Sequence, residues 1–213
     1  MSDNLLSIPP DEQRQAFMSL TNPRDVAKLL DYKYSNFVFH IYKTSDKDKY
    51  TVFEVPKKSG GIRIITTPSH SMKRIQRRLN EVLQKVYKPK PVVYGFVQNR
   101  NIVENAERHK KKNWVLNLDL ENFFPSINFG RVRGMFMGKP YNLPASVATL
   151  LAQICCFNNE LPQGAPTSPI VSNMICAKLD SQLQDLAWQH HCFYTRYADD
   201  ITFQLPCLNF LRK

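Results

Sequence analysis

Two adjacent aspartates divide the stretch Phe193-Tyr194-Thr195-Arg196-Tyr197-Ala198-Asp199-Asp200-Ile201-Thr202-Phe203-Gln204-Leu205. The residues on either side are rich in aromatic and β-branched types, so the stretch predicts a hairpin that turns at Ala198-Asp199-Asp200. Two carboxylates held this close repel each other unless a cation lies between them. The hairpin therefore indicates a divalent-metal site. A plain surface turn is the alternative, because Asp is common in turns.

A third carboxylate follows an apolar run upstream. A buried strand is predicted by Val115-Leu116-Asn117-Leu118-Asp119-Leu120. A charge at the end of an apolar strand needs a partner or a metal. If this strand lies beside the hairpin, Asp119, Asp199 and Asp200 converge. Three such carboxylates suit two Mg²⁺ ions, which clamp the attacking and leaving oxygens of a phosphoryl transfer.

A stiff, proline-rich loop lies between these carboxylates in the sequence. It runs from Leu161 to Pro169 and leads into a long apolar helix. Gly164 allows a close backbone approach, and Gln163 both donates and accepts hydrogen bonds. The loop is therefore a candidate part of the same site, with a plain connection as the alternative.

Composition narrows the class of protein. The chain has 213 residues, 43% of them hydrophobic, and a formal net charge of +11. That length is enough for one core or two small subdomains, and the basic charge favours a polyanionic partner. No apolar run approaches the roughly 20 residues that span a bilayer, and no secretory signal begins the chain, so we expect a cytoplasmic protein with no membrane partner. The five cysteines form no C-x-x-C pair, which argues against a zinc site.

The remaining periodicity predicts a mixture of helices and strands. The predicted helices are Pro10–Leu20, Pro23–Leu30, Ser69–Tyr87, Asn101–Lys111, Pro144–Phe157 and Pro169–His190. The other predicted strands are Asn36–Tyr42, Tyr50–Val55 and Gly61–Thr66. Since these elements show no steady βαβ alternation, we predict an α+β fold.

Three of these segments together resemble a known family. In chain order, Asp119 with Phe124, then Leu161–Pro169, then Tyr197-Ala198-Asp199-Asp200 resemble motifs A, B and C of reverse transcriptases. The first aspartate of motif A and the first of motif C are 80 residues apart (199 − 119). Three boxes in this order are far more specific than any one of them.

Shorter segments extend the resemblance and narrow the branch. Residues 117–127 are similar to the bacterial enzymes, which include group II intron, diversity-generating and retron reverse transcriptases. Lys57–Pro68 resembles the fingers motif, and Gly95-Phe96 resembles the motif that follows it. Residues 105–109 match the N-A-x-x-H pattern of retron enzymes. We interpret His109 as a family marker without a chemical step, with an ordinary helix-face histidine as the alternative.

The resemblance implies roles in the reaction. Asp119, Asp199 and Asp200 match the metal-binding catalytic residues, for two Mg²⁺ ions or Mn²⁺ as a substitute. Phe124, five residues after Asp119, matches the aromatic gate that excludes a 2′-hydroxyl. A core phenylalanine is the alternative for Phe124.

Further residues match the nucleotide and template sites. Gln163 resembles the glutamine that lines the nucleotide pocket, and Arg63 the fingers arginine that contacts the triphosphate. Lys57 and Lys58 either assist Arg63 or form a solvated turn. The predicted helix 69–87 carries basic residues that are either a solvated face or a template contact: Lys73, Arg74, Arg77 and Arg78.

The family fold is a right hand with fingers and palm, the palm a small antiparallel sheet backed by helices. By resemblance we expect an N-terminal helical extension at 1–30, fingers at 31–92 and palm at 93–213, with a fingers-associated helical insertion near 129–160. The resemblance covers roughly residues 20–205, and we expect no thumb, which suggests a shortened chain.

The implied function is RNA-directed DNA synthesis of the retron type. The expected partners are a structured noncoding RNA as template and primer, its DNA product and dNTPs, with an effector protein as a further candidate and anti-phage defence as the role. The alternative is a truncated, catalytically silent, basic RNA-binding module. RNA-dependent RNA synthesis is a third alternative, which a bulky Phe124 argues against.

Overall fold

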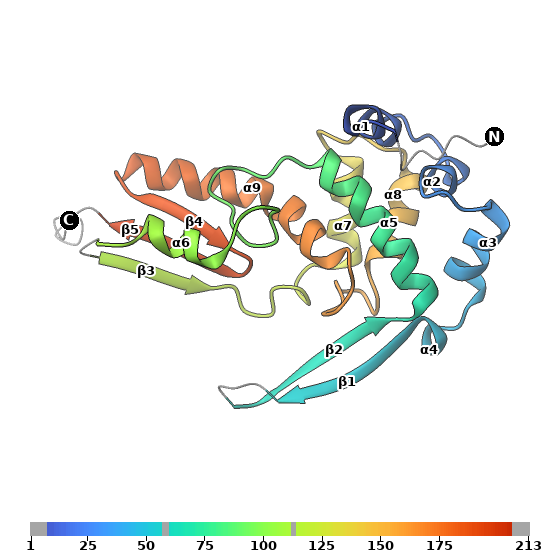
Figure 1. The fold of residues 1–213 in the computed structure, drawn as a ribbon, viewed down its shortest axis with the longest axis horizontal. Helices are drawn as coiled ribbons and strands as arrows, with labels where there is room; N and C mark the ends of the chain where they lie inside the picture. The colour runs from blue at the N-terminus through green and yellow to red at the C-terminus, as the bar shows by residue number, and fades with distance from the viewer. Residues whose placement is uncertain (1–7, 57–59, 112–113, 206–213) are drawn as a thin grey trace. The chain divides into compact units, whose positions relative to one another are not determined.

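The computed structural model describes residues 8–56, 60–111 and 114–205, and Figure 1 draws their fold. Within these ranges helices combine with two small antiparallel sheets, which confirms the predicted α+β class. The chain divides into two compact units: residues 1–88 with 124–171, and residues 89–123 with 172–213. Among the described ranges, every helix is too short or too polar to cross a bilayer.

The first unit is mainly helical. Its elements are α1 (Pro10–Met18), α2 (Pro23–Leu29), α3 (Tyr34–Val38), η1 (Phe39–Lys43), α4 (Asp46–Lys49), β1 (Tyr50–Pro56), β2 (Ile62–Pro68), α5 (His70–Val86), α7 (Phe129–Met137) and α8 (Ala145–Cys155). β1 and β2 pair as an antiparallel hairpin, as Figure 1 shows. The core of this unit is organised by α5, whose Ile75, Leu79 and Leu83 are fully buried. This apolar stripe at helical spacing is the pattern that predicted the helix.

One predicted strand in this unit is wrong. Residues 36–42 are helical, divided between α3 and η1. Phe37 and Ile41 are both buried, four residues apart, which is the spacing that places two side chains on one side of a helix. Aromatic and β-branched content favoured a strand locally, but burial of this pair in the unit overrides that preference.

The second unit holds a three-stranded sheet. Its elements are α6 (Ile102–Arg108), β3 (Trp114–Asp119), β4 (Phe193–Tyr197), β5 (Asp200–Leu205) and most of α9 (Ser168–Gln189). The strand order is β3-β5-β4, and both pairings are antiparallel. The hairpin predicted around Ala198 is therefore confirmed, and its second strand pairs with the strand that ends in Asp119.

Two helices lie on opposite faces of β4. Successive side chains of a strand point to opposite faces. Tyr194 and Arg196 hydrogen-bond Asp180 on α9, whereas Thr195 hydrogen-bonds His109 at the end of α6. The β4–β5 hairpin is thus held from both sides within its own unit.

The prediction of a buried β3 is wrong. Leu116 and Leu118 are 44% and 47% exposed. β3 is the edge of the sheet, and the apolar cluster around α9 contains Ala187, Tyr194 and Ile201 from α9, β4 and β5. The apolar run therefore predicted the strand correctly but not the exposure of its side chains.

Candidate catalytic site

The three predicted catalytic aspartates come together at one end of the sheet. Asp119 is the last residue of β3 and stands opposite Asp200, the first residue of β5. Residues opposite each other in an antiparallel pair project from the same face. Asp199 precedes Asp200 in the turn, and its carbonyl accepts a hydrogen bond from the Leu120 amide at 3.1 Å. The backbone of both carboxylate-bearing segments is therefore tied together.

The electrostatics at this end of the sheet are those of crowded anions. Burial, and then the charges of Asp199 and Asp119, raise the pKa of Asp200 above its usual range. A divalent cation would offset this repulsion, and carboxylate oxygens are the ligands that Mg²⁺ prefers. Within the described residues no group of three or more acidic, histidine or cysteine side chains is placed so that it could hold a metal ion. The donor chemistry fits Mg²⁺, which commonly keeps waters and substrate phosphates among its ligands.

The predicted nucleotide-binding residues belong to the other unit. Arg63 is exposed on β2, and the half-buried Gln163 lies in the proline-rich loop. The Gln163 carbonyl accepts a hydrogen bond from the Thr66 amide at 2.9 Å, so the loop is held against the strand that carries Arg63. Gly164 has φ +128°, and a Cβ there would lie 3.1 Å from the Thr66 carbonyl oxygen. The close approach expected at Gly164 is thus observed.

The remaining predicted residues of the nucleotide site are Phe124, Lys57 and Lys58. Phe124 is half-buried in the turn that precedes α7, and its carbonyl accepts a hydrogen bond from Ile127 at 3.1 Å. Lys57 and Lys58 lie outside the described residues, so their assistance to Arg63 stays a prediction.

The basic residues of α5 divide into two kinds. Arg74 and Arg77 are exposed, and Lys73 is half-exposed. Arg78 instead donates to the Leu30 carbonyl at 2.6 Å, pairs with Asp31 at 3.2 Å and lies over the Tyr32 ring. Arg78 therefore anchors the end of α2, and its template contact stays a prediction beside that structural role.

Comparison with known proteins identifies the family. Residues 55–206 match the family described as reverse transcriptase (RNA-dependent DNA polymerase), a range that includes all three aspartates. The chain belongs to the reverse transcriptase family.

Curated relatives of this chain include retron reverse transcriptases. It is 38% identical to the retron Ec86 reverse transcriptase of Escherichia coli over 86% of this chain and 57% of that protein. It is 35% identical to the retron Mx65 reverse transcriptase of Myxococcus xanthus over 94% of this chain and 52% of that protein. The chain thus spans about half the length of the curated relatives it matches. The retron-type resemblance stated from the sequence is confirmed.

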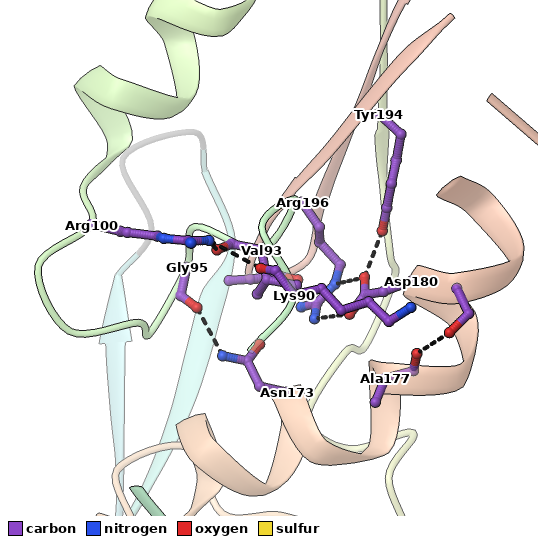
Figure 2. A network of polar contacts seen from close by, with 11 residues as sticks. Lys90, Val93, Gly95, Arg100, Asn173, Ala177, Asp180, Tyr194 and Arg196 are labelled. Atoms are coloured by element: carbon purple, nitrogen blue, oxygen red, sulfur yellow. Dashed lines mark hydrogen bonds and ion pairs between the residues drawn. The ribbon is translucent and has the colours of Figure 1, made fainter. Parts of the chain in front are cut away.

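Sequence reasoning missed a buried ion pair beside the three aspartates. Asp180 of α9 and Arg196 of β4 are both fully buried and make two hydrogen bonds, at 2.7 and 2.8 Å. Figure 2 shows the pair together with Tyr194, whose hydroxyl donates to the same carboxylate at 2.6 Å. The available signal was Arg196, a single charge within an otherwise uncharged strand, because a buried charge requires a partner.

His109 has a structural contact. Its Nε2 lies 2.7 Å from the Thr195 hydroxyl, and burial lowers the pKa of the imidazole. The contact joins the end of α6 to β4. Its interpretation as a family marker without a chemical step stays a prediction.

We expect Gly95→Ala to destabilise the second unit by about 1–3 kcal/mol or more, the usual cost of overpacking. A Cβ at Gly95 would overlap the Ala198 amide nitrogen and lie 2.8 Å from the Tyr197 carbonyl carbon. Both are backbone atoms that no side-chain rotation relieves. The change should appear in urea unfolding. Gly134→Ala in α7 is the control, since a Cβ there meets nothing within 4 Å and should stabilise the helix. Equal midpoints for wild type and Gly95→Ala would contradict the expectation.

Proposed function

We propose that this chain is the catalytic part of a retron-type RNA-directed DNA polymerase that copies a structured noncoding RNA into DNA. The observation that carries the proposal is the pairing of Asp119 with Asp200, with Asp199 beside them, in a chain of the reverse transcriptase family. The raised pKa of Asp200 supports a cation site at the same place.

The aspartates would hold two Mg²⁺ ions, or Mn²⁺ in their place. When bound, such ions activate a primer 3′-hydroxyl and neutralise charge on the triphosphate and the leaving pyrophosphate. The protein's own part is to keep three carboxylates at fixed positions at one end of the sheet. The register between β3 and β5 and the Leu120 hydrogen bond supply that fixation.

Other residues would bind the incoming dNTP. Arg63 would contact the triphosphate, with Lys57 and Lys58 as assistants, and Gln163 would line the nucleotide pocket. The hydrogen bond between the Gln163 carbonyl and the Thr66 amide supports a joint role for the loop and β2. Arginine suits this role because its planar fork matches phosphate oxygens.

The exposed basic side chains of α5 would contact the template. Lys73, Arg74 and Arg77 are available to phosphates, with Arg78 as a further, partly committed candidate. Contacts of this kind depend strongly on salt because each releases counterions. A chain with a net charge of +11 also suits this partner.

By the same resemblance we propose a cytoplasmic protein that acts in anti-phage defence, with an effector protein among its partners. The retron resemblance alone supports these assignments. The competing function is a catalytically silent RNA-binding module. The basic charge supports it, but it gives the three aspartates no role.

Primer extension on an RNA template with dNTPs and Mg²⁺ or Mn²⁺ tests the proposal. The expected result is DNA synthesis by the wild-type chain. RNA binding without synthesis under either metal would favour the silent RNA-binding module. The salt dependence of RNA binding should weaken in an Arg74→Ala/Arg77→Ala variant if α5 contacts phosphates.

Phe124→Ala should admit ribonucleotides. If the ring excludes a 2′-hydroxyl by overpacking, which costs about 1–3 kcal/mol, discrimination against ribonucleotides should fall about 10- to 100-fold. Single-nucleotide incorporation with dNTPs and rNTPs measures the ratio. Phe39→Ala is the control, because Phe39 is an exposed phenylalanine of η1. An unchanged ratio in Phe124→Ala would assign Phe124 to packing alone.

A further inference from the structure

The turn that carries the catalytic aspartates has a strained backbone. Ala198 has φ +58° although it is not glycine, and its side chain is buried. A residue with a Cβ avoids this left-handed region because the Cβ crowds the following carbonyl oxygen. Such a conformation persists only where the surroundings determine it strongly, and it recurs at functional sites. Something in the second unit must therefore hold Ala198 in place.

Arg196 makes the contact that does so. Its Nη1 donates to the Ala198 carbonyl at 2.8 Å, while its Nε and Nη2 donate to the two oxygens of Asp180. The guanidinium is planar with its donors in fixed directions. Once Asp180 fixes one edge of this plane, the remaining nitrogen has one direction in which to donate. That direction is the carbonyl directly before Asp199.

The backbone around the turn is clamped a second time. The Tyr94 amide donates to the Arg196 carbonyl at 2.8 Å, and the Arg196 amide donates to the Val92 carbonyl at 2.9 Å. Gly95 follows and lies too close to the Ala198 backbone to admit a Cβ. Asn173 of α9 holds this segment by donating to the Gly95 carbonyl at 2.9 Å, as Figure 2 shows. α9 thus supports the turn through Asp180 and through Asn173.

An ion pair is a costly way to fill this position if packing were its only purpose. Burying two charges loses their hydration, and apolar residues of similar volume often give equal or greater stability. Burial opposes the charge on the guanidinium, but hydrogen bonding to Asp180 and the charge of Asp180 raise the pKa of Arg196, so it stays charged. What apolar residues lack is a donor aimed at the Ala198 carbonyl.

We propose that Arg196, oriented by Asp180 and Tyr194, is the positioning residue of the aspartate turn and sets where the Asp199 and Asp200 carboxylates lie. The assignment rests on the proposed polymerase function and names a residue that acts on the site through the backbone. Arg196 itself touches neither metal nor nucleotide in this role.

Two substitutions separate positioning from stability. Arg196→Lys keeps a positive charge beside Asp180 but replaces the planar fork with a single point charge. The triple variant Asp180→Leu/Tyr194→Phe/Arg196→Met removes the buried charges together and refills the space with apolar groups. Arg131→Lys is the matched control, because Arg131 also donates to a backbone carbonyl, that of Ser126 at 3.0 Å, in the other unit.

Two measurements on the 213-residue chain report the position of the turn and do not require DNA synthesis. Hydrogen exchange of the Leu120 amide reports its bond to the Asp199 carbonyl. The protein is also titrated with Mn²⁺ alone, and the electron paramagnetic resonance signal measures the free Mn²⁺. The resulting affinity reports whether the carboxylates are placed to bind the ion. We expect faster Leu120 exchange and Mn²⁺ affinity about 10- to 100-fold weaker in both Arg196 variants, the usual range for residues that orient metal ligands. Arg131→Lys should leave both unchanged.

Wild-type exchange and Mn²⁺ affinity in Arg196→Lys would overturn the proposal, as would a folded triple variant with wild-type values. If Arg196→Lys fails to fold, the triple variant decides. If the wild type binds no Mn²⁺, the proposed metal site fails, and Leu120 exchange still decides whether Arg196 positions the turn.

Discussion

Asp199→Asn is expected to reduce RNA-templated DNA synthesis by about 1,000-fold or more while the fold stays intact. Metal ions contribute several kcal/mol of transition-state stabilisation, and each 1.36 kcal/mol is tenfold in rate. An amide keeps the size of the carboxylate and removes its charge, so the loss is one of metal binding rather than packing. Asp119→Asn should behave in the same way, because Asp119 stands opposite Asp200 in the sheet.

Asp199→Asn should also weaken the pH dependence of stability in the metal-free protein. Asp200 has a pKa raised in the folded state by burial and then by the charges of Asp199 and Asp119. A carboxyl with a raised folded pKa takes up protons on folding, so stability rises as the pH falls from that raised value toward the ordinary 3.8. Removing the charge of Asp199 lowers the folded pKa and flattens this rise.

Primer extension and thermal unfolding between pH 4 and pH 8 measure the two effects. Asp185→Asn is the control, because Asp185 is an exposed aspartate on α9. DNA synthesis that survives both Asp199→Asn and Asp119→Asn would remove these aspartates from the metal site. Loss of synthesis together with loss of the fold would show a structural role instead.

Asp180→Ala is expected to lower the free energy of unfolding by about 3–5 kcal/mol, the usual cost of leaving a buried charge unpaired. The Arg196 guanidinium would lose two hydrogen bonds, and it does not neutralise by releasing its proton. The Tyr194 hydroxyl would lose its acceptor as well. The other group that accepts a hydrogen bond from the Arg196 guanidinium is the Ala198 carbonyl, which carries no charge.

Urea unfolding of the metal-free chain measures this cost. Asp185→Ala, on the exposed face of the same helix, should change the unfolding free energy by no more than about 0.5 kcal/mol. The triple variant Asp180→Leu/Tyr194→Phe/Arg196→Met should recover most of the loss, because it removes the stranded charge. Similar values for Asp180→Ala and Asp185→Ala would mean that water or another group reaches Arg196.

Local patterns predicted most elements and failed in two informative places. The α5 helix followed from apolar residues at helical spacing, and the β4–β5 hairpin from strand-forming residues around a turn. Residues 36–42 contain the same residue types as a strand, yet Phe37 and Ile41 are buried together on a helix. β3 has the sequence of a buried strand but lies at the sheet edge. Residue type indicates which secondary structures a segment can adopt. The tertiary neighbours of the segment decide whether it is buried and whether it forms a helix or a strand.

The sequence by itself determined the family, the three aspartates and the hairpin that carries two of them. These depend on residue type and short spacing, which the chain shows directly. Only the tertiary structure decided that Asp119 faces Asp200, that Gly95 lies against Ala198 and that Asp180 holds Arg196. Each of these joins segments distant in sequence, and their pairing depends on strand order and on which helix covers which face. The carboxylates of the turn can thus be predicted from the sequence, whereas the contacts that hold the turn in place depend on the fold.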